Sequence, residues 1–296
     1  MSHTSTDPSQ PENGYVFNLE SGPEVTRLIH QDRLFATALD EELPESLDLS
    51  DAHDILDIAC GPASWALDMA YRYPKINVVG IDISDSVLEF ARARAHVQGL
   101  ENNVRFLIMD ATKPLAFPDN SFDFVHARLL LGFMHPAAWP ALLQECLRIT
   151  RPGGIICLTE CEGSLTNSPA LEKLNSMGML AMKLIGRTFS PDGRSFGITP
   201  MLAPLLRDAG YQETKIKAHG VDFSTGTVHH DGFYQDFQVI LELARPMLLK
   251  LNLTTQEEAE RLYYQALAEM MQDDFCALWY FLTAWGKKSA SSAQNG

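Results

Sequence analysis

Three aspartates that follow apolar runs are the residues of this chain best placed to do chemistry. Asp57 precedes a turn of small residues, Asp82 ends a second apolar run, and Asp110 ends a third. The carboxyl ends of parallel strands meet at one edge of a sheet, and α/β folds bind nucleotide-like ligands at that edge. Carboxylates there can accept hydrogen bonds from a ribose and from an adenine amine. The spacing therefore predicts a site for an adenosine-containing cofactor.

The turn after the first run contains the smallest residues of this predicted site. It spans Asp57–Ala63 and leads directly into a helical pattern. Small residues at Ala59 and Gly61 let the backbone approach a ligand, and a helix start presents unpaired amides. We expect Ala59, Cys60 and Gly61 to contact the ligand. Asp57 has two open roles, since it can bind the ligand or hold the amides of the turn.

The second and third aspartates have different predicted partners. In doubly wound folds the acidic residue that ends the second strand accepts hydrogen bonds from a ribose diol. Asp82 has that position, with Ile83 beside it. Asp110 is suited to accept from the exocyclic amine of adenine, and Ala111 leaves room for a flat base.

Two other nucleotide sites are disfavoured by the same turn. The dinucleotide fingerprint G-x-G-x-x-G requires glycines at 59, 61 and 64, where this chain has Ala59, Gly61 and Ser64. A G-x-x-x-x-G-K-[ST] loop is also missing from the sequence. A single adenosine is therefore favoured over a dinucleotide or a nucleoside triphosphate.

Apolar periodicity predicts the elements that position these residues. Strands are expected at 54–59, 76–81, 103–109, 122–126, 155–160, 211–219 and 275–285. Helices are expected at 63–73, between Ser84 and Gly99, and at 137–150, 168–186, 200–209, 230–250 and 255–273. Alternating strands and helices predict an α/β fold with a doubly wound, mostly parallel seven-stranded sheet. The last strand is expected to be antiparallel.

The remaining segments are expected to flank or cover this sheet. The predicted divisions are a disordered tail at 1–14, N-terminal cap helices within 15–50, the main domain at 51–286, and a disordered tail at 287–296. Within the main domain, cap insertions are expected at about 162–198 and 222–273, over the edge that carries the aspartates.

Composition limits the classes of partner that the protein is expected to bind. The 296 residues carry a net charge of −15, which argues against nucleic acid or an anionic membrane surface as a partner. Five cysteines, with no visible secretory signal, favour a reduced cytoplasmic setting. Cys157 and Cys161 are four apart on one expected strand, and no second pair has zinc-site spacing, so no metal is expected. The expected partner is a small-molecule acceptor, and the oligomeric state is left open.

Taken together, these motifs resemble the class I methyltransferases that use S-adenosylmethionine. The closest resemblance is to the small-molecule branch related to quinone-biosynthesis methyltransferases. It is carried by Asp57–Ala63, Asp82, Asp110–Ala111, Ser121–Arg128 and Arg151–Gly154. The resemblance implies a Rossmann-like fold, S-adenosylmethionine as cofactor and S-adenosylhomocysteine as product. The family pattern acid-x-Gly-x-Gly-x-Gly has alanine here at its first and third glycines.

The segment upstream of the sheet also resembles that branch, in which an N-terminal helix folds over the cofactor. By this resemblance Arg27 meets the cofactor carboxylate, with Tyr15 and Gln31 nearby. The alternative is an ordinary amphipathic helix that keeps Arg27 and Gln31 in water. Arg128, at the ligand-side end of the fourth strand, either contacts the cofactor or substrate or forms a surface salt bridge.

Catalysis itself needs few side chains in such an enzyme. The methyl group of a sulfonium is already electrophilic, so alignment of the acceptor can supply about 7–11 kcal/mol of barrier reduction. A base is therefore optional, and the weak candidates are His135 and Glu160.

The acceptor and two rival functions stay open. The apolar cap insertions suggest a hydrophobic or aromatic acceptor, and the methionines within 168–186 either pack in the core or line its pocket. The rivals are another enzyme on the same fold, such as an aminopropyl transferase or an NAD-dependent dehydrogenase, and a non-catalytic regulator that binds S-adenosylmethionine.

Overall fold

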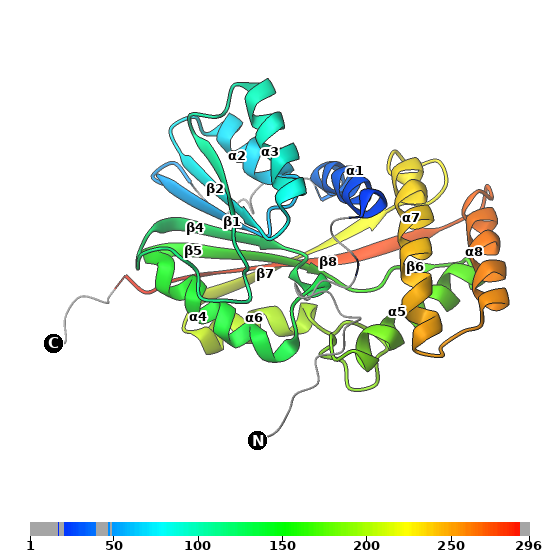
Figure 1. Ribbon diagram of the computed structural model, residues 1–296. Coiled ribbons are helices and arrows are strands. Elements are labelled where there is room, and N and C mark those ends of the chain that lie inside the picture. The colour runs from blue at the N-terminus through cyan, green and yellow to red at the C-terminus, as the bar shows by residue number, and fades with distance from the viewer. Residues whose placement is uncertain (1–16, 18–20, 40–46, 48, 291–296) are drawn as a thin grey trace, which may run out of the picture.

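A mixed sheet, mostly parallel, forms the centre of the molecule (Figure 1). The computed structural model describes residues 17, 21–39, 47 and 49–290. The strands are β1 (Asp54–Ile58), β2 (Asn77–Asp82), β3 (Val104–Ile108), β4 (Phe122–Arg128), β5 (Thr150–Cys161), β6 (Leu165–Thr166), β7 (Gln212–Asp222) and β8 (Ala277–Lys287). Their order is β3-β2-β1-β4-β5-β8-β6, and β7 pairs with β8 on its other side. Strands β1 to β5 run parallel, and β8 is antiparallel to β5, β6 and β7.

The predicted α/β fold is confirmed, and each of the seven expected strands is present. The additional strand, β6, has two residues and pairs only with the start of β8. A two-residue strand has no period that could be read from the sequence.

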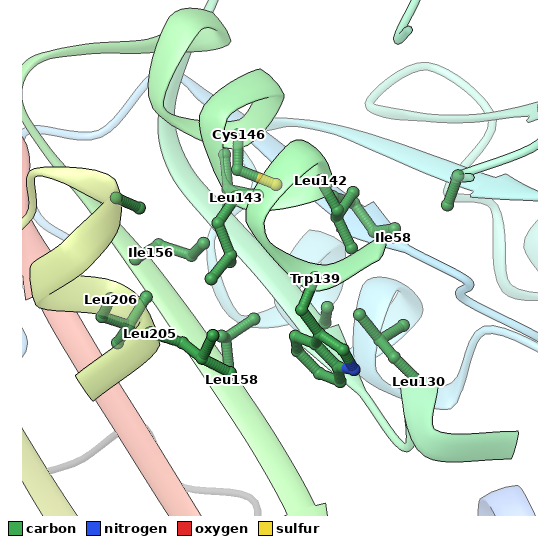
Figure 2. Packing of buried hydrophobic residues seen from close by; sticks show 14 of the residues in the cluster. Ile58, Leu130, Trp139, Leu142, Leu143, Cys146, Ile156, Leu158, Leu205 and Leu206 are labelled. Atoms are coloured by element: carbon green, nitrogen blue, oxygen red, sulfur yellow. The ribbon is translucent and has the colours of Figure 1, made fainter. Parts of the chain in front are cut away.

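Helices cover both faces of the sheet (Figure 1). One face carries α2 (Ser64–Arg72) and α3 (Asp85–Gln98), and the other carries α4 (Trp139–Ile149) and α6 (Thr199–Ala209). Figure 2 shows the second layer, in which Leu143 and Cys146 from α4 and Leu206 from α6 pack with Ile156 of β5. Burial on both faces explains why the parallel strands are almost wholly apolar.

A third group of helices packs beside the sheet rather than on it (Figure 1). It consists of α5 (Pro169–Leu184), α7 (His230–Lys250) and α8 (Gln256–Met270), which contact one another. These helices fall within the segments 162–198 and 222–273. The helix α1 (Gly22–Ala38) packs against α7. A separate apolar core, which includes Phe35, Phe233 and Phe281, joins this group to the C-terminal end of β7 and the N-terminal part of β8.

The C-terminal end of the sheet lies beyond the expected division at residue 286. Strand β8 includes Lys287, and the Nζ of Lys288 donates to the carbonyl oxygens of Thr150 and Leu147 at 2.7 and 2.8 Å. The ordered sheet therefore extends past 286, where a tail was expected. Within 15–50, the described residues hold one helix, α1, and the expected tail 1–14 lies outside the described residues.

Two further observations concern only the described residues. Among them, no helix is long and apolar enough to cross a membrane. No group of three or more His, Cys, Asp or Glu residues in that part of the chain could hold a metal ion.

Candidate functional site

A cleft lies where β1, β2, β3 and β4 end, and α1 forms one of its walls. Most of the predicted cofactor residues line it: Gln31, Ala59, Cys60, Gly61, Asp82, Ile83, Asp110, Ala111 and Arg128. The carboxyl ends of adjacent parallel strands bring these residues together, as the topology predicted.

The turn after β1 keeps a glycine-like backbone although two of its residues are alanines. Ala59, Gly61 and Ala63 have φ values of 52°, 55° and 68°, all in the left-handed region. That region costs a residue with a Cβ atom about 1–2 kcal/mol. A Cβ atom at Gly61 would meet no other atom within 4 Å. The turn is therefore strained at its alanines and open above its glycine.

Asp82 closes this turn and also faces the cleft. Its carboxylate accepts from the backbone N–H of Gly61 and of Ser84, each at 3.0 Å. Burial raises the pKa of Asp82 even though these hydrogen bonds favour the ionised form. A carboxylate has about four acceptor positions, so Asp82 keeps capacity for a ligand diol.

Asp110 is a second acceptor at the cleft. Its carboxylate accepts from the backbone N–H and the hydroxyl of Thr112 at 2.9 and 2.6 Å, and it pairs with the Nζ of Lys113 at 2.9 Å. Burial acts to raise the pKa of Asp110, but the bonds from Thr112 and Lys113 outweigh it and hold that pKa below its ordinary value. Asp110 is thus held as an ionised acceptor beside the small residue Ala111.

Asp57 does not line the cleft. It is buried in β1, and its Oδ1 lies 2.7 Å from the Nδ1 of His126 in β4. The His126 ring stacks on Trp65, with ring centroids 3.8 Å apart. Asp57 therefore joins β1 to β4, and the turn amide of Gly61 is held by Asp82 instead.

Arg27 does not line the cleft either, and it is not in water. It is 4% exposed, and its guanidinium pairs with both oxygens of Glu24 at 2.7 and 2.8 Å and with Asp236 of α7 at 3.2 Å. Gln31 donates to the same Asp236 at 3.1 Å. Arg27 therefore joins α1 to α7, contrary to both sequence interpretations. Tyr15 lies outside the described residues.

Asp32 is a residue of the site that sequence reasoning missed. Its carboxylate accepts from the backbone N–H of Ser64 at 2.9 Å, from Arg94 at 3.4 Å and from Arg128 at 3.1 Å. These bonds hold α1 against the start of α2 and the end of β4. The partners lie 32, 62 and 96 residues away in the sequence, so no local pattern could have revealed them.

A second pocket adjoins the cleft and encloses about 230 Å³. The two share Gln31, Phe35 and Leu129 as lining residues. The second pocket is mainly apolar and is lined by α1, α5, α7, Phe196 and Trp279. Met179 and Met182 line it, whereas Met177 is buried in the adjacent core.

The weak catalytic candidates line neither pocket. His135 is exposed, and its Nδ1 lies 3.2 Å from the carbonyl oxygen of Gly186. Glu160 is buried and accepts from the backbone N–H groups of Leu130 and Leu131 at 2.7 and 3.3 Å. Burial raises the pKa of Glu160 to about 8. Its role here is to hold the turn after β4, next to the shared residue Leu129.

The neighbouring Glu162 does line the second pocket. It accepts from the backbone N–H of Gly197 at 2.9 Å and from the hydroxyl of Thr199 at 2.9 Å. Both bonds fix the loop before α6, so this carboxylate has a structural function in the pocket wall.

Comparison with known proteins agrees with this geometry. A family described as a methyltransferase domain matches residues 55–154. Demethylmenaquinone methyltransferase of Geobacillus kaustophilus is 27% identical over 199 residues, which are 64% of this chain and 82% of that protein. Methyltransferase GfsG of Streptomyces halstedii is 34% identical over 211 residues, which are 61% of this chain and 72% of that protein.

Two solved structures share the fold. Phosphoethanolamine N-methyltransferase 2 of Haemonchus contortus, in complex with phosphomonomethylethanolamine and S-adenosylhomocysteine, superposes with a TM-score of 0.53 at 17% identity. The match covers 92% of this chain and 59% of that one. The YcgJ protein of Bacillus subtilis superposes with a TM-score of 0.51 at 17% identity, covering 88% and 99%.

Proposed function

Because this chain belongs to the class I S-adenosylmethionine-dependent methyltransferases related to quinone-biosynthesis enzymes, we propose that it methylates a small apolar or aromatic acceptor held in the second pocket. When bound, S-adenosylmethionine supplies an electrophilic methyl group. One observation carries the proposal. The apolar pocket adjoins the cofactor cleft at Gln31, Phe35 and Leu129, so an acceptor in the pocket would lie next to the cofactor.

The cleft fits the cofactor in three respects. The open space above Gly61 admits a ligand chain close to the backbone of the turn. Asp82, with Ile83 beside it, would accept from the ribose hydroxyls, and Asp110 would accept from the adenine amine above Ala111. Charge-assisted hydrogen bonds of this kind contribute about 1.5–3 kcal/mol each.

The two arginines of the site have different roles under this proposal. Arg128 lines the cleft beside Asp32 and would face the cofactor carboxylate. Arg27, which resemblance alone had given that role, lines the second pocket and holds Asp236. Gln31 lines both pockets and donates to the same Asp236. The bonds of Arg27 and Gln31 to Asp236 therefore hold in place the side chains between the two pockets.

The contribution of the chain to the reaction is then alignment and exclusion of water. Helix α1 covers the cleft, with Phe35 at the meeting point of the two pockets. An acceptor held there in line with the methyl group gains most of the roughly 7–11 kcal/mol that orientation can supply. His135 and Glu160 lie outside both pockets, so the proposal assigns them no proton transfer.

A methylation screen tests this function. The protein is incubated with S-adenosylmethionine labelled in its methyl group and a panel that contrasts apolar phenols and naphthols with phosphoethanolamine and glycine. We expect label in the apolar acceptors. Met179→Trp should block their methylation by filling the pocket, whereas Leu180→Trp should not, because Leu180 is the adjacent, exposed residue and does not line the pocket. Methylation of the hydrophilic acceptors alone would contradict the proposal.

A further inference from the structure

Gly178 lies in the interior of helix α5, where a glycine needs an explanation. Glycine is among the least favourable residues inside a helix because it loses the most backbone freedom on folding. The backbone at this position does not require it, since Gly178 has helical geometry and is not among the residues with positive φ. The reason for glycine must then lie in the space beside it.

That space belongs to the second pocket. The α5 residues that line the pocket are Leu174, Asn175, Gly178, Met179 and Met182. Their spacing of one, three and four places them on one face of the helix. Gly178 is at the centre of this face, so a side chain there would point into the pocket.

Other glycines nearby are explained by packing, and Gly178 is not. A Cβ atom at Gly163 would meet the Cε of Met179 at 3.2 Å, and one at Gly232 would meet the Cδ1 of Leu34 at 2.8 Å. A Cβ atom at Gly178 would meet nothing within 4 Å. The glycine therefore leaves an opening that no atom of the described chain fills.

The lining around this opening is apolar or already satisfied. Asn175 donates to the hydroxyl of Ser164 at 2.9 Å, which occupies the polar end of its side chain. Helix α7 contributes Ile240, Leu241 and the small Ala244 to the same pocket. An occupant of the opening would meet mostly carbon and sulfur.

We propose that Gly178 is a specificity-determining residue, which leaves room in the second pocket for the bulky apolar body of the acceptor. The inference rests on the proposed function for the identity of the occupant as the acceptor. It goes beyond that function by assigning the size limit of the acceptor to one position.

Binding of N-phenyl-1-naphthylamine, a neutral apolar fluorescent probe made of a naphthalene and a phenyl group, tests the proposal in the full chain. We expect the probe to bind the wild type, to bind Gly178→Ala a few-fold more weakly, and to bind Gly178→Leu at least about tenfold more weakly, because each added side chain takes up space that the probe would occupy. The affinity for S-adenosylhomocysteine, measured by calorimetry, should not change. Ser176→Ala, on the exposed side of α5, should alter neither affinity.

Thermal unfolding adds an independent result. Gly178→Ala should raise the unfolding midpoint by about 2 °C, because alanine favours the helix and its methyl group meets open space. A lowered midpoint would show that the opening is filled and would overturn the proposal. Two further outcomes would overturn it: the wild type does not bind the probe, or both Gly178→Ala and a folded Gly178→Leu bind it with wild-type affinity. Failure of the proposed function has a different signature: probe binding follows the Gly178 series, but no apolar acceptor is methylated.

Discussion

The cleft and the second pocket, which we propose hold the cofactor and the acceptor, adjoin each other, yet they are built in opposite ways. Apart from α1, the cleft is made by residues at the ends of successive strands, between Ala59 and Phe133. The pocket is made mainly by helices and loops drawn from positions between Phe17 and Leu248, together with Cys161 of β5 and Trp279 of β8. The cleft carries the carboxylates of Asp32, Asp82 and Asp110 among its apolar residues, whereas the pocket presents mainly apolar side chains. Under the proposed function, the cofactor is bound where successive strands end, and the acceptor is bound by segments that are far apart in the sequence.

The border between these two regions is a short turn held by a buried acid. Leu129 lines both pockets and has a left-handed φ of 58°. The 3-10 turn that follows it, Leu130–Gly132, is held by Glu160. Experiments on residues of the cleft, the border and α1 can therefore separate the two regions.

The largest effect is expected from the pH dependence of stability at the border. Burial raises the pKa of Glu160 to about 8 in the folded protein, whereas an unfolded Glu titrates near 4.3. Between these values the unfolded state binds fewer protons, so stability falls as pH rises. Glu160 should account for a loss of about 3–4 kcal/mol between pH 5 and pH 8.

Urea unfolding of the wild type and Glu160→Gln measures this loss. The variant cannot ionise, so its stability should decline less over the same pH range, and the difference between the two proteins should grow toward pH 8. Parallel pH profiles would show that Glu160 does not control the border.

The second prediction concerns the bonds that hold α1 over the cleft. Asp32→Ala leaves Arg94, Arg128 and the amide of Ser64 without their shared carboxylate. Loss of one partner of a buried ion pair costs 3–5 kcal/mol, and because both arginines are partly exposed we expect about 2–3 kcal/mol here. Affinity for S-adenosylmethionine should fall with it, since α1 covers the cleft.

The control for Asp32 is an exposed ion pair of similar composition. Asp85→Ala removes the surface partner of Arg92 and should cost less than about 1 kcal/mol. Equal losses from the two variants, in chemical unfolding, would rule out a special role for Asp32 in holding α1.

The third prediction separates cofactor binding from acceptor binding. Asp82→Asn should weaken the affinity for S-adenosylmethionine about 10- to 100-fold, the value of a charge-assisted hydrogen bond. Stability should fall by about 1–3 kcal/mol as well, because the Asn amide oxygen can accept from only one of the two backbone N–H groups, those of Gly61 and Ser84, that Asp82 holds. Binding of N-phenyl-1-naphthylamine should not change. The exposed Asp208→Asn on α6 is the control, and wild-type calorimetric affinity in Asp82→Asn would remove Asp82 from the cofactor site.

The same contrast explains what could be predicted from the sequence. The strand positions followed from apolar runs, and Asp82 and Asp110 followed from being at strand ends, because both signals depend on neighbouring residues. Even the helices of the cap, α5, α7 and α8, were expected at nearly their observed positions, since periodicity is also local.

What escaped prediction depends on partners far apart in the chain. Asp32 has no distinctive neighbours, and its role arises only when α2 and β4 come under α1. Arg27 was assigned to the cofactor by resemblance, but Asp236 lies 209 residues away and redirects it. The acceptor pocket likewise exists only after α5 and α7 have packed, so its lining could not be chosen from an apolar pattern.

The smallest predicted effect concerns the strain in the turn after β1. Ala59 has a φ of 52°, where glycine is free of the steric cost that an alanine bears, although it loses more chain entropy on folding. Ala59→Gly should therefore leave stability unchanged or raise it by up to about 1 kcal/mol, with cofactor affinity retained. Ala93→Gly, at an exposed position in α3, should instead lower stability by about 1 kcal/mol. Both variants replace alanine with glycine, so opposite changes in stability in urea unfolding would isolate the backbone strain at Ala59. Equal losses of stability would mean that the turn relaxes around its alanine and that the cleft is not shaped by a strained loop.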